Sequence, residues 1–302
     1  MSRNQKIRIA MVVCGVVVIV AVLAALSGIF NGTGYTFANA EKYTAGDAEI
    51  AEPVNNLEID WVEGQVRIEY ADQNTVTLRE TAPRAIGEDQ KLRWWLDGDT
   101  LRIHYAKSGW RQLFGIFNGN NSKTLTLTLP EGRTMERAVI HTVSADQVIP
   151  ALKVRSMELT ATSGDMQVTA EAEEIRVNTV SGDQTLRFMG TAKSTELTAI
   201  SGDVHAEIEA SEETKISTTS GQIGLKAGKT DRTEIATVSG DVNVALPEEP
   251  GFTAKVSTVS GKLDSTLALT KEGSTYISGD GSESVEISTV SGDIRVEGLQ
   301  GQ

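Results

Sequence analysis

The chain has 302 residues with 41 acidic and 28 basic side chains, so its formal net charge is −13 at pH 7. This acidic balance argues against nucleic acid as a partner, because binding it requires a basic surface. A single cysteine excludes an intramolecular disulfide and a thiolate metal cluster, and an aromatic content of 5% argues against a large aromatic enzyme core.

Residues 9–30 are apolar and contain no charged side chain. A helix of this length spans ~30 Å, the thickness of the bilayer core. Arg3, Lys6 and Arg8 precede the segment, whereas the first charge after it is Glu41, so the positive-inside rule places the N-terminus in the cytoplasm. The sequence therefore predicts a single-pass protein of the cell membrane whose C-terminal region is extracellular.

Two other interpretations of this segment stay open, a cleaved signal peptide and a buried globular helix. The small-x-small pattern of Ala38-Asn39-Ala40 resembles a cleavage site, but it lies ten residues beyond the apolar run. With an uncleaved anchor, residues 1–8 are a cytoplasmic tail. Residues 31–52 are then a polar linker that keeps the folded part near the membrane surface.

Residues 53–138 are β-like but less regular than the C-terminal half of the chain, and we expect them to form an irregular N-terminal cap. Residues 57–68 fit the strand–turn–strand template of the later repeats, with Glu63-Gly64 at the turn. Asp97-Gly98 is a hairpin signal between two short strands. Residues 125–130 alternate Leu and Thr, and a proline ends this predicted strand.

An aromatic segment in this cap has two interpretations. Trp110, Phe114 and Phe117 are flanked by Lys107 and Lys123, so they are a candidate contact loop for the membrane interface or a ligand. Alternatively, they cover the open end of the β architecture, because an uncapped end exposes unpaired backbone groups.

Residues 139–302 contain an internal repeat whose core is Ser-Gly-Asp or a close variant. An aliphatic residue stands four positions before each serine, and Thr or Ala stands two before it, which is the period of a strand. Glycine reaches a positive φ at little cost, so each Ser-Gly is predicted to be a structural turn. The turn residues are Ser163, Gly164, Ser181, Gly182, Ser201, Gly202, Ser220, Gly221, Ser239, Gly240, Ser260, Gly261, Ser291 and Gly292, with an earlier variant at Ser144.

The period of about 20 residues is too short for a propeller blade, which needs ~40. It suits one coil of an all-β solenoid, or β-helix, in which equivalent residues stack ~4.8 Å apart. The alternative is a meander or sandwich in which each Ser-Gly is a hairpin turn. We favour the solenoid because the same residue types recur at the same positions. The last repeat follows an insertion, residues 269–284, which we expect to project as a loop or hairpin.

These segments together resemble the bacterial putative-adhesin family of β-strand-repeat proteins, a domain of unknown function. The likeness covers residues 43–302 and lies in residues 43–50, 57–61, 92–99 and 127–132 and in the serial Thr-Val-Ser-Gly-Asp units. The anchored layout is similar to that of Gram-positive members. The resemblance implies a β-solenoid-like fold in the cell envelope, and some members are linked to envelope-stress signalling. It implies no catalytic residues.

The sequence contains little that indicates chemistry. His104, His141 and His205 share no metal-ligand spacing and are expected to be solvated or on strand faces. The repeated serines have no paired histidine, so we predict no catalytic residues and no cofactor, with a carbohydrate-active enzyme as a distant alternative. Stacked coils would align the aspartates, so Asp165, Asp183, Asp203 and Asp241 are weak candidates for calcium binding; otherwise turn N–H groups bind them locally.

From residue 141 to the end there are 25 acidic and 13 basic residues, so the acidity belongs to the repeats. Such a surface attracts cationic peptides or basic proteins, although it also serves solubility. The sequence therefore predicts a non-enzymatic binding or structural module of the cell envelope. Its partners would be envelope proteins, glycans or cationic peptides. The alternative is an accessory protein that senses or regulates envelope stress.

Overall fold

The computed structural model describes residues 30–31, 34–109, 122–249, 251–272 and 275–299. These residues form an all-β fold with two short 3-10 helices, η1 (Ala40–Lys42) and η2 (Glu88–Gln90). No helix in these ranges is long and apolar enough to cross a membrane. The predicted tail, all of the predicted anchor but Phe30, and the aromatic residues Trp110, Phe114 and Phe117 lie outside the described residues.

The chain divides between Ala170 and Glu171 into two compact units, which we take in turn. The N-terminal unit holds β1 (Phe30–Asn31), β2 (Gly34–Tyr35), β3 (Thr44–Ala45), β4 (Ala48–Ile50), β5 (Asn56–Ala71), β6 (Val76–Thr81), β7 (Arg93–Asp97), β8 (Thr100–His104), β9 (Lys123–Pro130) and β10 (Met135–Ser163); β11 (Met166–Ser181) crosses the boundary.

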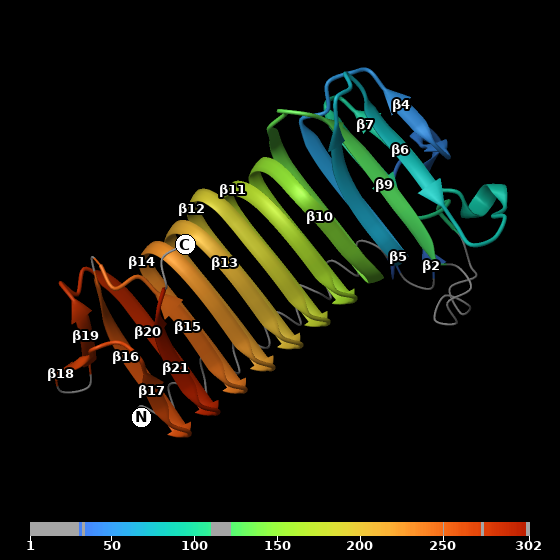
Figure 1. The fold of residues 1–302 in the computed structure, drawn as a ribbon. Coiled ribbons are helices and arrows are strands. Elements are labelled where there is room, and N and C mark those ends of the chain that lie inside the picture. The colour runs from blue at the N-terminus through green and yellow to red at the C-terminus, as the bar shows by residue number, and fades with distance from the viewer. Residues whose placement is uncertain (1–29, 32–33, 110–121, 250, 273–274, 300–302) are drawn as a thin grey trace. The chain divides into compact units, whose positions relative to one another are not determined.

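Strand β5 organises the N-terminal unit because it has parallel neighbours on both sides (Figure 1). On one side β10 pairs with it so that Ser144 lies opposite Glu63 and Ala145 opposite Gly64. This register confirms that residues 57–68 follow the repeat template. On the other side β8 and then β9 lie along β5.

Antiparallel strands cover the outer side of this parallel arrangement. Strand β7 pairs with β8 through a turn at Gly98-Asp99, which confirms the predicted hairpin. Strand β6 pairs with β9, and the short strands β3 and β4 pair with β7 and β6. The buried interior includes Trp61, the largest fully buried side chain of the described residues.

The C-terminal unit continues from β11 with strands of the repeat. Its strands are β12 (Gln184–Ser201), β13 (Val204–Ser220), β14 (Ile223–Ser239), β15 (Val242–Leu246), β16 (Gly251–Ser260), β17 (Leu263–Ser265), β18 (Thr270–Glu272), β19 (Thr275–Gly279), β20 (Glu283–Ser291) and β21 (Ile294–Gly298).

Successive repeats of this unit pair in parallel and in register. Ser201 lies opposite Ser220, and Ser220 opposite Ser239, so the repeated serines form a column. The aliphatic position forms an inner column in the same way, and Leu197, Ile216 and Ile235 are fully buried. A hairpin meander would pair consecutive strands antiparallel, whereas β12 and β13, which are joined at Ser201-Gly202, pair in parallel, so the Ser-Gly turn is not a hairpin turn.

The order of the repeats in space differs from their order in the chain. The last repeat, β20–β21, lies between β14–β15 on one side and β16–β17 on the other (Figure 1). Ser291 is accordingly opposite both Ser239 and Ser260. The insertion forms the hairpin β18–β19, as expected, but β19 also pairs antiparallel with β16 instead of only projecting.

The turn glycines are required by how closely the repeats approach each other. Gly202, Gly221 and Gly240 have φ values of 125°, 138° and 151°, which L side chains rarely adopt. A Cβ on Gly221 would also overlap the carbonyl oxygen of Gly202 in the preceding repeat. Ala145 stands at the glycine position of the earlier variant, and its φ is not positive, since Asn39 is the only described non-glycine residue with a positive φ.

Candidate functional site

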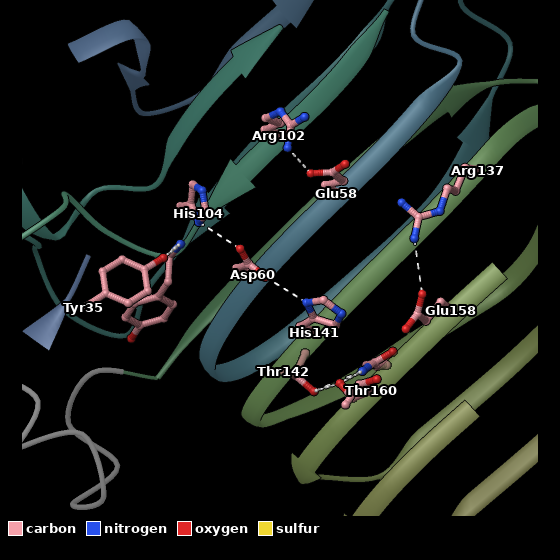
Figure 2. Close-up of polar contacts among 12 residues, drawn as sticks. Tyr35, Glu58, Asp60, Arg102, His104, Arg137, His141, Thr142, Glu158 and Thr160 are labelled. Carbon is pink, nitrogen blue, oxygen red and sulfur yellow. Dashed lines mark hydrogen bonds and ion pairs between the residues drawn. The ribbon is translucent and has the colours of Figure 1, made fainter. Parts of the chain in front are cut away.

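A histidine–carboxylate cluster lies where three parallel strands of the N-terminal unit meet. The register places His104 of β8 and His141 of β10 on either side of Asp60 in β5. The Nδ1 atoms of both histidines are 3.2 Å from oxygens of the Asp60 carboxylate. Figure 2 marks both contacts with dashed lines. Parallel pairing thus brings together two histidines that are far apart in the sequence.

The two histidines differ in environment. His104 is buried, and burial lowers the pKa of its imidazole from 6.5 to about 4, although the negative charge of Asp60 opposes this shift. Its ring stacks on Phe37 with centroids 3.9 Å apart and an interplanar angle of 11°. His104 is therefore a neutral imidazole at pH 7. His205, the third histidine, is exposed on β13.

An aromatic cavity opens beside His104. Phe37 precedes η1, Tyr43 follows it, and their ring centroids are 4.8 Å apart. Tyr43 in turn packs edge-to-face against Trp95 of β7 at 5.6 Å. The cavity has a volume of about 240 Å³, and its lining residues are Phe37, Ala38, Asn39, Tyr43, Trp95, Asp97, Arg102 and His104.

The polar groups at this cavity carry opposing charges. Arg102 of β8 forms an ion pair with Glu58, visible in Figure 2, and its Nε is 3.5 Å from Asp97. The ammonium of Lys42 lies 4.6 Å from the centroid of the Trp95 ring. Burial raises the pKa of the Tyr43 hydroxyl to about 12, so this group stays protonated and can donate a hydrogen bond.

A second charged cluster in the same unit is closed to solvent. The Lys123 ammonium is 2.5 Å from Glu80, and the exposed fractions of the two side chains are 2% and 4%. The ammonium also donates to the carbonyl oxygens of Gln90 and Tyr105. Burial lowers the pKa of Lys123 to about 8, against the opposing effect of Glu80. Because the ammonium of Lys123 makes all of these contacts inside the unit, the cluster joins β9, β6 and the η2 loop. We therefore assign it a structural role.

The repeated aspartates bind backbone. The carboxylate of Asp183 accepts the N–H of Asp203 at 2.9 Å, and that of Asp203 accepts the N–H of Gln222 at 2.8 Å. Asp241 accepts the N–H of Asp293 in the same way, and in the N-terminal unit Asp146 accepts that of Asp165. Among the described residues no group of three or more His, Cys, Asp or Glu side chains is placed to hold a metal ion.

The residues that the sequence singles out and the cavity beside His104 therefore lie at different places in the fold. The repeated Ser-Gly turns are where the sequence predicts them, and the Asp column is an interstrand contact. The aromatic cavity was not predicted, because Phe37 and Asn39 fall in the expected linker and His104 has no local signal. The clustering of tryptophans before residue 111 and the motif residues Tyr43 and Trp95 are the sequence features that indicate it.

Comparison with known proteins identifies the family. Residues 54–297 match the Toastrack DUF4097 family, so the chain belongs to this family of unknown function. No curated protein matches the chain.

Several solved structures are also similar to this chain. A putative adhesin from Bacteroides fragilis is 14% identical, with 86% of this chain and 98% of that one covered and a TM-score of 0.42. A putative adhesin from Parabacteroides merdae is 9% identical, with 86% and 97% covered and a TM-score of 0.40. A putative cell adhesion protein from Clostridium sporogenes is 12% identical, with 84% and 100% covered and a TM-score of 0.26.

Proposed function

We propose that this protein is a non-enzymatic binding module of the cell envelope, held at the membrane by residues 9–30 with its β region outside the cell. We further propose that each unit is built as a β-solenoid. The in-register parallel pairing of β12, β13 and β14 supports this architecture. The apolar, uncharged run of residues 9–30 and the basic residues before it support the anchor.

The observation that favours a binding or structural role over a catalytic one is the use of the repeated residues. The aspartates bind the backbone of the next repeat, and the glycines stand where the carbonyl of the neighbouring repeat leaves no room for a Cβ. The residues that dominate the sequence thus hold neighbouring repeats together. Catalysis would need one asymmetric set of base, nucleophile and stabiliser instead.

The location is tested by labelling of engineered cysteines in intact cells. A Glu212→Cys variant on the exposed surface of β13 should react with a membrane-impermeant maleimide without lysis. A Ser2→Cys variant should react only after lysis, since it precedes the anchor. Both variants carry Cys14→Ser, so that the native thiol gives no signal. If Ser2→Cys but not Glu212→Cys is labelled in intact cells, the topology is the reverse of the one proposed.

The role is tested by deleting the protein. Loss of surface attachment, together with retention of the purified chain by cell-wall fractions, is the expected outcome. If deletion changes the output of an envelope-stress reporter but leaves attachment unchanged, the regulatory alternative is correct and the binding role is not. Turnover of a glycan by the purified chain would overturn both.

A further inference from the structure

The aromatic cavity has the composition of a sugar-binding subsite. Phe37, Tyr43 and Trp95 supply apolar ring surface, while Asn39, Asp97 and Arg102 supply an amide, a carboxylate and a guanidinium. From these residues and the volume of the cavity we propose that it binds one pyranose residue of an uncharged glycan. This inference rests on the proposed binding function and names its ligand class.

The volume fits a single ring. Sites for drug-sized molecules span roughly 300–1,000 Å³, and this cavity has about 240 Å³. A pyranose also combines an apolar C–H face with hydroxyl groups that both donate and accept hydrogen bonds. An aromatic wall beside mixed donors and acceptors is complementary to that combination.

The charges favour an uncharged ligand over an ion. Arg102 and Asp97 both line the cavity. A cation in it would be repelled by the guanidinium of Arg102, and an anion would be repelled by the carboxylate of Asp97. Arg102 already pairs with Glu58 and lies 3.5 Å from Asp97, so these charges are largely balanced within the protein. His104 adds a neutral imidazole and Tyr43 a protonated hydroxyl, and both groups can form hydrogen bonds with the hydroxyls of an uncharged ligand.

Asn39 contributes an amide to the lining of the cavity from a left-handed backbone position. Its backbone has φ 54° and ψ 32°, although most residues in this conformation are glycines. Its side chain makes no capping hydrogen bond to the helix η1 that it precedes. Asparagine tolerates the left-handed region better than most other non-glycine residues, so this backbone holds the Asn39 side chain at the cavity without unusual strain.

The test uses the full-length chain in detergent micelles. Methyl glycosides of glucose, galactose, mannose and N-acetylglucosamine are titrated, with saturation-transfer NMR and tryptophan fluorescence as readouts. We expect at least one to bind with a dissociation constant in the millimolar range. Trp95→Leu and Asp97→Asn should each weaken it at least tenfold.

Trp94→Leu is the matched control, since Trp94 is the neighbouring tryptophan of β7 and does not line the cavity. It should bind within twofold of the wild type, and thermal melting of each variant identifies loss of folding. If Trp95→Leu unfolds, Asp97→Asn on the exposed end of β7 decides alone. Equal binding by wild type and a folded cavity variant would overturn the proposal. So would saturation by tetramethylammonium or inorganic phosphate with no pyranoside bound.

The outcome is separable from the proposed function. If no pyranoside binds but cell-wall fractions still retain the chain, only the cavity proposal fails. If a pyranoside binds through Trp95 and deletion leaves attachment unchanged, the envelope-binding role fails while the subsite stands.

Discussion

At the scale of single residues, the repeat depends on glycine because two constraints coincide at one position. The turn needs a positive φ, and the carbonyl of the preceding repeat occupies the place of a Cβ. At Gly98, in the β7–β8 turn, φ is also positive (65°), but no atom lies within 4 Å of the place that a Cβ would occupy. The two positions therefore separate backbone strain from steric overlap.

We expect Gly221→Ala to lower the free energy of unfolding by about 3 kcal/mol, because strain and overlap both act. Gly98→Ala should cost about 1 kcal/mol, from the left-handed backbone alone. Urea unfolding of the two variants and the wild type measures both values. Equal losses would mean that contact with the preceding repeat has no effect.

His104 makes stability depend on pH in a predictable direction. Its pKa in the folded protein, about 4, is below the ordinary value of 6.5, so the unfolded chain takes up more protons between these two values. The stabilisation is therefore fully present above about pH 6.5 and is lost as the pH falls to about 4. A pKa difference of this size corresponds to at most about 3 kcal/mol.

The slope of unfolding free energy against pH should be reduced in His104→Gln between pH 4 and 6.5. His205→Gln, at an exposed histidine of the C-terminal unit, serves as the control and should keep the wild-type slope. Urea titrations at half-unit pH steps measure the slopes, which removes any constant loss of stability in the variants. A wild-type slope in His104→Gln would contradict the buried neutral imidazole.

At the scale of strands, aspartate after the turn acts as an acceptor for the next repeat. This explains an exception in the sequence: Lys262 replaces the aspartate at the turn before β17, which pairs only with β21 among the described strands. The N–H of Lys262 still donates to Asp293 at 2.8 Å. No further described repeat follows that could need a carboxylate from position 262.

Asp203→Ala should lower the free energy of unfolding by about 1 kcal/mol, because the N–H of Gln222 loses its acceptor. Asp203→Asn keeps an oxygen at this position and removes a negative charge near Asp183, so it should stay within about 0.5 kcal/mol of the wild type. Chemical unfolding at low and high salt compares them. An Asn variant as unstable as the Ala variant would show that charge, rather than the hydrogen bond, matters.

At the scale of the whole molecule, the chain threads its last repeat back into the C-terminal unit. Strands β20 and β21 separate β14–β15 from β16–β17, so the final residues are interior to the pairing order. A solenoid that stacked in chain order would place them at its end. The spacing of 31 residues between Ser260 and Ser291 is longer than the other repeats because it also contains the hairpin β18–β19.

This topology predicts that two deletions differ in how much they destabilise the C-terminal unit. Removal of residues 251–282 takes away β16 to β19 and leaves β14–β15 beside β20–β21, so the remaining unit should unfold cooperatively. Truncation after Ser282 removes fewer residues but takes away β20 and β21, the parallel partners of β16 and β17, and leaves β16 paired only with β19 among the described strands. We expect a lower midpoint of thermal unfolding and faster amide hydrogen exchange in β14 for the truncation. A truncation milder than the internal deletion would refute the observed order.

The repeat was predictable from the sequence because parallel in-register pairing favours similar residue types at the same position in each repeat. The inner aliphatic column, the Ser-Gly turns, the early variant at Glu63-Gly64 and the hairpin at Gly98 all follow from local patterns of this kind. The family was also recognisable from the sequence, since residues 54–297, which match it, contain these segments.

The candidate site and the strand order could not be predicted in this way. Asp60, Trp95 and His104 come together because β5, β7 and β8 pair, and Phe37, from the segment before η1, stacks on His104. No spacing in the chain encodes these contacts. The last repeat carries the same Ser-Gly-Asp pattern as the others, so the pattern alone does not give its place in the pairing order. Local backbone preferences and repeated packing thus determined the strand and turn of each repeat. The tertiary structure alone decided which repeats are neighbours and where a cavity opens, because these depend on contacts between residues distant in the chain.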